Sequence, residues 1–307
     1  MSDATQTISP TSPYTLKRVS VLDSEMAYID TGSGDGSENT VIFLHGNPTS
    51  SFLWRNIMPH LEPHARCLAP DLIGMGQSGK IPAQDGETPM YRFVDHYRYL
   101  SAWLDGVVPD MGRNITLVVH DWGSALGFNW AYHNPERIKA IAYMEAIVCP
   151  VSWDDWPEPA RGPFMGMRSE KGEDLVLNRN FFIERILPAS IMRTLTDEEM
   201  NTYRQPYLEA GESRRPTLTW PREIPLAGEP ADVVAIVDTY SKWLQTCDTP
   251  KLFINAKPGT ILTGPQREFC RTWPNQEEVT VKGLHFIQED SPHEIGEAVA
   301  ALVQRLS

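Results

Sequence analysis

Three side chains of this sequence have the types and the chain order of a catalytic triad. Asp121, Glu145 and His285 each follow a short apolar stretch that is typical of a buried strand. An aspartate carboxylate can attack carbon, a histidine can act as general base, and a second carboxylate can orient that histidine. Each residue alone could be ordinary, for example a buried aspartate that caps a helix. Their joint placement after strands, where open α/β sheets hold their sites, predicts a nucleophilic catalytic site.

The stretch around Asp121 is the most informative part of the sequence. Residues 115–119 are apolar or β-branched, which predicts a strand buried on both faces, and residues 122–133 predict a helix with small residues in its first turn. A polar residue between such a strand and helix is left above the sheet, beside helix N–H groups that favour negative charge. This arrangement resembles the nucleophile elbow of α/β-hydrolases, with Asp121 replacing the usual serine and Val119 replacing the first glycine.

The elements that must position these residues alternate between strand and helix. Strands are expected at residues 17–22, 25–30, 40–44, 66–69, 115–119, 137–144, 251–255 and 278–281. Helices are expected at residues 50–60, 91–107, 122–133, 231–245, 265–273 and 292–306. The first two strands should be antiparallel, and the later alternation implies right-handed crossovers between parallel strands. The sequence therefore predicts an α/β fold with a mostly parallel eight-stranded sheet and helices on both faces.

Residues 149–228 differ in character from the rest of the chain, because they are rich in proline, tryptophan, phenylalanine and methionine. Helices are expected there at residues 175–186 and 196–210, the second with Thr196 as N-cap and Glu199 three residues later. We interpret this region as a helical cap domain inserted into a core domain. The core domain would comprise residues 1–148 and 229–307.

The composition excludes some classes of partner. The 307 residues include 27 Lys and Arg against 40 Asp and Glu, a formal net charge of −13, which argues against binding to nucleic acid or an anionic membrane. The four cysteines are scattered, which predicts unpaired thiols in a reducing compartment. No spacing of Cys or His indicates a metal site. The sequence does not predict an oligomeric state.

The N-terminal residues 1–14 are polar, contain two prolines and lack the apolar run of a signal peptide. No apolar run elsewhere approaches the length of a membrane span. A cytoplasmic location is therefore expected.

Four motifs give the sequence a resemblance to a known family. HGNP at 45–48, VHDWG at 119–123, MEA at 144–146 and GLHFIQEDSP at 283–292 resemble haloalkane dehalogenases, and the similarity covers nearly the whole chain. It implies the α/β-hydrolase fold, with the acid after the sixth strand and a halide-binding asparagine after the third. It further implies Asp121 as nucleophile, His285 as base and Glu145 as acid. The residues that would bind halide or line the substrate pocket are Asn47, Trp122, Phe164, Phe182, Pro221 and Ile261.

The side chains at these positions suit the chemistry that the resemblance implies. A carboxylate can displace halide from a saturated carbon and form an alkyl ester on Asp121. The indole N–H of Trp122 and the amide N–H groups of Asn47 can bind the departing anion. Water activated by His285 can then hydrolyse the ester, while the backbone N–H groups of Trp122 and Asn47 stabilise its oxyanion. The expected substrates are a small halogenated aliphatic molecule and water, and no cofactor or metal is needed.

Two other functions stay open on the sequence. An epoxide hydrolase of the same fold would need two cap phenols, but the cap has only Tyr203 and Tyr207, four residues apart on one expected helix. Such enzymes usually carry the acid after the seventh strand, and residues 254–264 contain no Asp or Glu. A non-catalytic ligand receptor on a hydrolase scaffold is the second alternative. Release of halide from a simple bromoalkane separates these functions.

Overall fold

A single sheet organises the computed structural model, which describes residues 7–32, 39–83, 88, 90–108 and 114–307. Among these residues, eight strands pair in the order β1-β2-β4-β3-β5-β6-β7-β8. β2 is antiparallel to β1 and β4, and the other neighbouring strands are parallel. The predicted mostly parallel sheet and its antiparallel start are therefore confirmed. The strands are β1 (Lys17–Val21), β2 (Ser24–Asp30), β3 (Thr40–Leu44), β4 (Arg66–Pro70), β5 (Ile115–Asp121), β6 (Ile138–Ala146), β7 (Lys251–Pro258) and β8 (Gln276–Gly283).

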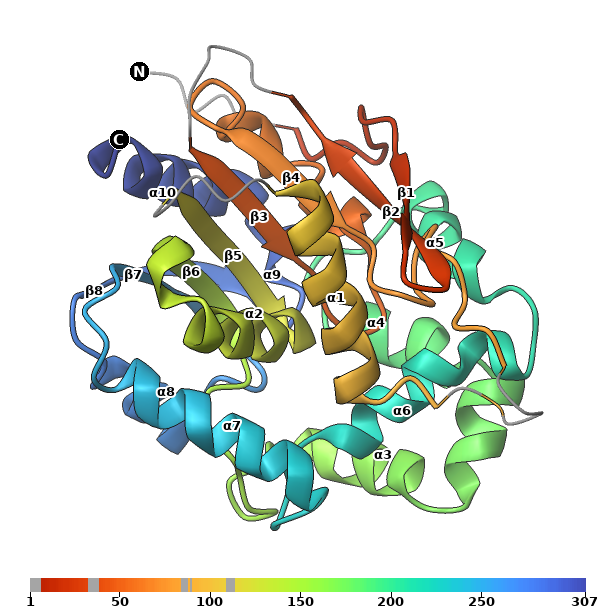
Figure 1. Cartoon of the computed structure of the whole chain (residues 1–307). Helices are drawn as coiled ribbons and strands as arrows, with labels where there is room; N and C mark the ends of the chain where they lie inside the picture. The colour runs from red at the N-terminus through yellow and green to blue at the C-terminus, as the bar shows by residue number, and fades with distance from the viewer. Residues whose placement is uncertain (1–6, 33–38, 84–87, 89, 109–113) are drawn as a thin grey trace.

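Helices cover both faces of the sheet, as predicted (Figure 1). Successive residues of β3 show why: Ile42 and Leu44 enter one hydrophobic core, and Val41 and Phe43 enter the other. The first core includes side chains of α1 (Phe93–Val107), α2 (Trp122–His133), α7 (Ala231–Leu244) and α8 (Gly264–Arg271). The second includes side chains of α9 (Ile287–Asp290) and α10 (Pro292–Arg305).

The segment between β6 and α7 is helical and lies beyond the carboxyl ends of the parallel strands (Figure 1). Its α-helices are α3 (Glu158–Arg168), α4 (Leu187–Ala189), α5 (Asp197–Arg204) and α6 (Arg215–Glu223). Met167, Val176, Leu177, Phe182 and Leu218 form a small hydrophobic core within this segment. The boundaries of a cap domain at 149–228 and a core domain at 1–148 and 229–307 stay a prediction.

Several expected helices differ from those observed. The stretch 50–60 forms two short 3-10 turns, Ser51–Trp54 and Met58–His60, instead of one helix. Residues 175–186 form two π-helical turns, Glu173–Asn178 and Phe182–Ile186, because Asn180 between them has a left-handed φ of 52°. The helix expected to reach residue 210 ends at Arg204, where a 3-10 turn containing Pro206 follows. That turn is Gln205–Tyr207, and further 3-10 turns are Pro135–Arg137 and Glu212–Arg214.

All four cysteines are free thiols. In the described part of the chain, no helix is both long and apolar enough to cross a membrane. Residues 1–6 of the N-terminal stretch lie outside the described residues, and the cytoplasmic location stays a prediction.

Candidate active site

Asp121 lies at the end of β5, at a sharp turn into α2. Its φ of 49° and ψ of −130° place it in the left-handed half of conformational space, which is unusual for a residue with a Cβ. α2 begins at the next residue, and Gly123 in its first turn touches β3. A Cβ on Gly123 would lie 2.2 Å from the Leu44 carbonyl oxygen. The small residue therefore allows the helix and strand to pass closely enough to hold Asp121 at the sheet edge.

Backbone N–H groups surround the carboxylate of Asp121. The Asn47 N–H donates to its Oδ2 over 2.8 Å, and the backbone N–H of Trp122, the next residue, helps to lower the pKa of this carboxyl. The loop that carries Asn47 passes so close that a Cβ on Gly46 would lie 2.2 Å from Oδ2. The sequence predicted that these two N–H groups are suited to hold an ester oxyanion, and the structure brings both to Asp121.

The imidazole of His285 lies between the two carboxylates. Its Nε2 is 3.4 Å from Oδ1 of Asp121, and its Nδ1 donates to Oε2 of Glu145 over 3.2 Å. The neighbouring His120 donates from Nε2 to the His285 carbonyl oxygen over 2.8 Å. The three side chains expected to form a triad therefore meet in the order nucleophile, histidine, acid.

Glu145 reaches His285 from a bulge in β6. The strand was expected to end at Met144, but it continues to Ala146, and the pairing with β5 skips Glu145 between them. Glu145 has a φ of 40°, and a bulge of this kind re-aims a side chain. Its Oε2 also accepts hydrogen bonds from the backbone N–H groups of Thr260 over 3.0 Å and Ile261 over 2.8 Å.

Asp121 and His285 each stabilise the charged form of the other, and this shifts both pKa values. Burial raises the pKa of the Asp121 carboxyl, but the hydrogen bond and charge of His285 outweigh it, so that pKa lies below its usual value. Burial lowers the pKa of His285, but hydrogen bonds and charges of Asp121 and Glu145 outweigh it and raise the pKa to about 9. The resting site therefore holds an Asp121 carboxylate beside a protonated His285. Burial lowers the pKa of His120 to about 3, which keeps that ring neutral.

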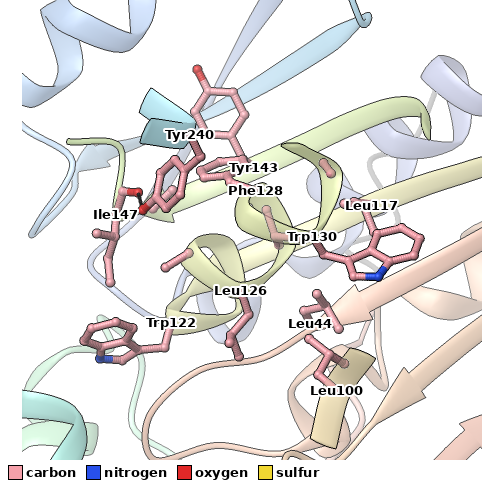
Figure 2. Packing of buried hydrophobic residues seen from close by; sticks show 14 of the residues in the cluster. Leu44, Leu100, Leu117, Trp122, Leu126, Phe128, Trp130, Tyr143, Ile147 and Tyr240 are labelled. Atoms are coloured by element: carbon pink, nitrogen blue, oxygen red, sulfur yellow. Dashed lines mark hydrogen bonds between the residues drawn. The ribbon is translucent and has the colours of Figure 1, made fainter. Parts of the chain in front are cut away.

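A cavity of about 530 Å³ opens above Asp121 and His285. Asn47 and Trp122 line it, and the Asn47 amide donates to the Thr217 carbonyl oxygen over 3.4 Å. Figure 2 shows the Trp122 indole projecting from the first turn of α2, apart from Leu126, which packs toward Leu44. The four residues expected to line a pocket, Phe164, Phe182, Pro221 and Ile261, all lie on the wall of this cavity. The rest of the wall is mostly apolar and includes Ile147, Val148, Cys149, Trp156, Ala160, Ile186, Ile224 and Leu284.

Some residues of the site were not predicted from the sequence. Trp220 stacks on Trp122 with ring centroids 4.4 Å apart, and His96 stacks on the other side of Trp220 at 4.2 Å. The only signal for Trp220 was its position beside Pro221, and no pattern indicated His96. The N–H groups of Thr260 and Ile261 were also missed, because a backbone contact leaves no mark on residue type. Across the described ranges, no cluster of His, Cys, Asp and Glu is arranged to hold a metal ion.

Comparison with known proteins connects this geometry to a family. The family model of the alpha/beta hydrolase fold matches residues 39–292. A haloalkane dehalogenase of Sphingobium indicum is 55% identical over 290 residues, which cover 94% of this chain and 95% of that protein. The chain belongs to the haloalkane dehalogenase family. The predicted fold and the predicted resemblance are confirmed, and so is the prediction of a hydrolase.

The same family relationship is visible in three dimensions. The crystal structure of an ancestral haloalkane dehalogenase, AncHLD2, superposes with a TM-score of 0.88 at 44% identity, covering 95% of this chain and 99% of that one.

A sequence relative with a different activity is a coelenterazine h 2-monooxygenase of Renilla reniformis, which is 47% identical over 293 residues, covering 94% of this chain and 91% of that protein. Relatives of the dehalogenases can therefore carry a different activity, so the reaction must be argued from the site itself.

Proposed function

We propose that this chain hydrolyses small haloalkanes through a covalent alkyl ester on Asp121. In the first step Oδ1 of Asp121 attacks the carbon that carries the halogen. The new C–O bond forms as the carbon–halogen bond breaks, and the halide leaves with the bonding electrons. The depressed pKa of Asp121 supports this step, because the attacking group is an ionised carboxylate that needs no base.

The departing halide is bound by the Trp122 indole N–H and the Asn47 side-chain amide. Both residues line the cavity beside Asp121, and neither donor can lose its proton at neutral pH. The mostly apolar wall excludes water, which strengthens the interaction between these donors and a developing negative charge.

His285 acts in the second step. Ester formation removes the negative charge of Asp121, which is one of the causes that raise the pKa of His285. The pKa of the imidazole therefore falls, and the neutral ring takes a proton from water as that water attacks the ester carbonyl carbon. The N–H groups of Asn47 and Trp122 hold the oxyanion. The alcohol then leaves with that proton from His285. The Asp121 carboxylic acid that remains passes the second proton of the water to His285, which restores the carboxylate beside a protonated imidazole.

The observation that carries this proposal is that the two carboxylate oxygens of Asp121 have different partners. Oδ2 accepts the Asn47 N–H over 2.8 Å, whereas Oδ1 lies 3.4 Å from His285 Nε2, and both Asp121 and His285 line the cavity. One oxygen is thus suited to attack carbon while the other becomes a carbonyl oxygen already bound by a donor.

The cavity favours this reaction over opening of an epoxide. No tyrosine is among the described residues that line it. Tyr203 donates to the Glu289 carboxylate, and Tyr207 is fully buried, so neither phenol is offered to a substrate. The described wall also contains no Lys or Arg that could bind the carboxylate of a halogenated acid.

Incubation with n-butyl bromide tests the proposal. We expect bromide and n-butanol in equal amounts, measured by ion chromatography and gas chromatography, and no product from Asp121→Ala. Styrene oxide and coelenterazine are tested in parallel. Diol formation or light emission without bromide release would contradict the proposal, and absence of all three products would favour a ligand receptor.

A further inference from the structure

The main chain of His285 is held by the helical segment that covers the site. The backbone N–H groups of His285 and Phe286 both donate to the Ser190 carbonyl oxygen, each over 3.1 Å. Ser190 also lines the cavity. The residue proposed as general base therefore takes its main-chain position partly from residues 190–193 rather than from the sheet alone.

Asp290 also connects the loop that carries His285 to the segment that follows Ser190. Its Oδ1 accepts the backbone N–H groups of Met192 over 2.8 Å and Arg193 over 3.1 Å. Its Oδ2 accepts the backbone N–H of Leu284, the residue before His285, over 3.2 Å. One carboxylate thus joins the segment after Ser190 to the loop that carries His285.

A buried ion network reinforces this junction. Arg193 donates from Nε to the Glu289 carbonyl oxygen over 2.6 Å and from Nη1 to Glu199 over 2.9 Å. Arg55, completely buried, pairs with Glu289 at 2.7 Å and with Glu199 at 2.6 Å. The network therefore links α5, α9 and the 3-10 turn after the Asn47 loop. Because the charges of Arg55, Glu199 and Glu289 are paired and buried, breaking the junction locally is costly.

We propose that Asp290 is a positioning residue that places the His285 imidazole for hydrolysis of the alkyl ester. The inference rests on the function proposed above. Asp290 makes no contact with the reacting atoms, and it acts through the Leu284 N–H and the segment that holds His285. The imidazole must keep Nδ1 on Glu145 while Nε2 faces the ester, and a shift of the His285 main chain disturbs both contacts at once.

The two steps of the reaction respond differently to such a shift. Attack by the Asp121 carboxylate needs no base, so ester formation is expected to change little. Ester hydrolysis needs the imidazole within hydrogen-bond reach of water, and a misplacement of about 1 Å can reduce such a rate on the order of a hundredfold. A slower second step with an intact first step is therefore the signature of lost positioning.

Rapid mixing of Asp290→Ala with n-butyl bromide, followed by acid quench and intact-protein mass spectrometry, measures both steps. We expect the alkyl-enzyme to form at the wild-type rate on every active site and to decay on the order of ten- to a hundredfold more slowly. Asp290→Asn keeps an oxygen for Met192 and Arg193 but turns an amide toward the Leu284 N–H. It should decay at an intermediate rate, and it decides the question if Asp290→Ala does not fold.

Asp238→Ala is the matched control, since Asp238 is half-exposed on α7 and pairs with Lys242 there. It should form and lose the ester as wild type does. Decay at the wild-type rate in both Asp290 variants would overturn the inference while the proposed function stands. Fewer reactive sites with normal decay would indicate a purely structural role and would also overturn it. Absence of any alkyl-enzyme in wild type and variants would instead contradict the covalent scheme.

Discussion

Asp121 and Glu145 are both buried carboxylates within reach of His285, yet their surroundings differ. Glu145 is bound by two N–H groups of the loop after β7 and by Nδ1 of His285, and it does not line the cavity. Asp121 lines the cavity. Both have left-handed φ values, a conformation that costs about 1–3 kcal/mol per residue and is concentrated at functional sites. This difference in placement supports the proposal that Asp121 attacks carbon and Glu145 orients the histidine.

Replacement of Glu145 by glutamine tests its role as the orienting acid. Oε2 alone accepts all three hydrogen bonds, so a glutamine oxygen can keep them, and the substitution removes the negative charge that supports the His285 imidazolium. We expect the protein to fold and its turnover to fall on the order of a thousand- to ten-thousandfold, as when the acid of a serine-protease triad is changed to an amide. Circular dichroism checks the fold and halide release checks turnover. Full activity of Glu145→Gln would place the acid elsewhere.

Replacement of Trp122 by phenylalanine removes the indole N–H but keeps an aromatic ring against Trp220. We expect turnover to fall on the order of ten- to a thousandfold, by comparison with the loss of an oxyanion-hole donor. Chlorinated substrates should suffer more than brominated or iodinated ones, because chloride leaves less readily. Trp156→Phe, at another tryptophan of the cavity wall, is the control and should retain most activity. Equal effects of the two substitutions would exclude a specific halide role for Trp122.

At the level of elements, the sequence predicted best where one physical requirement dominates. Residues 115–119 had to form a buried strand because they are apolar on both faces, and α2 was expected at 122–133 and found there. The bulge at Glu145 could not be predicted, because it depends on how β6 pairs with β5. The three residues of the expected triad were predicted from their places after strands and their chain order. The N–H groups near them belong to loops whose course is set by tertiary packing.

The helices α3 and α6 were not predicted, because the prolines within them interrupt the helical sequence pattern. α3 contains Pro163 and two glycines, and α6 contains Pro216 in its first turn and Pro221 near its end. Proline lacks an N–H and weakens a helix interior, so the local pattern indicates a loop. Packing of the segment against the core overrides that local preference. Pro221 and Phe164 of these helices then face the cavity.

The close crossing of α2 and β3 makes a prediction about stability. A Cβ on Gly123 would lie 2.2 Å from a backbone carbonyl oxygen of Leu44, and neither backbone can move without displacing Asp121. We expect Gly123→Ala to lower the free energy of unfolding by about 3 kcal/mol or to prevent folding. Gly106→Ala is the control, since nothing lies within 4 Å of a Cβ there. Gly106 is the penultimate residue of α1, so that alanine should raise stability by at most about 0.5 kcal/mol. Urea unfolding measures both, and equal stabilities would contradict the argument.

At the scale of the whole molecule, the Asp121–His285 pair links stability to pH. The native pKa of His285 is about 9, above its ordinary 6.5, so the folded protein binds the proton more tightly than the unfolded chain. The stabilisation from this residue is complete below pH 6.5 and is lost as pH rises through about 9. It amounts to about 3 kcal/mol at 1.36 kcal/mol per pKa unit.

Nuclear magnetic resonance of the His285 ring and urea unfolding over the same pH range measure this linkage. We expect the ring to lose its proton near pH 9 in the resting enzyme and the free energy of unfolding to decline across that window. Titration of the ring near 6.5 with no associated loss of stability would show that Asp121 and His285 do not form the charged pair.

The central claim is that Asp121 forms a covalent ester which only His285 can help to hydrolyse. His285→Phe should still allow the Asp121 carboxylate to attack, because that step needs no base, and should block activation of water. The decisive measurement is mass spectrometry of His285→Phe after incubation with n-butyl bromide, combined with the amount of bromide released. We predict one bromide per active site, no further turnover, and one butyl group retained on the peptide that contains Asp121. Protein of unchanged mass without a single turnover of bromide, or a butyl group on Glu145 instead, would contradict the account.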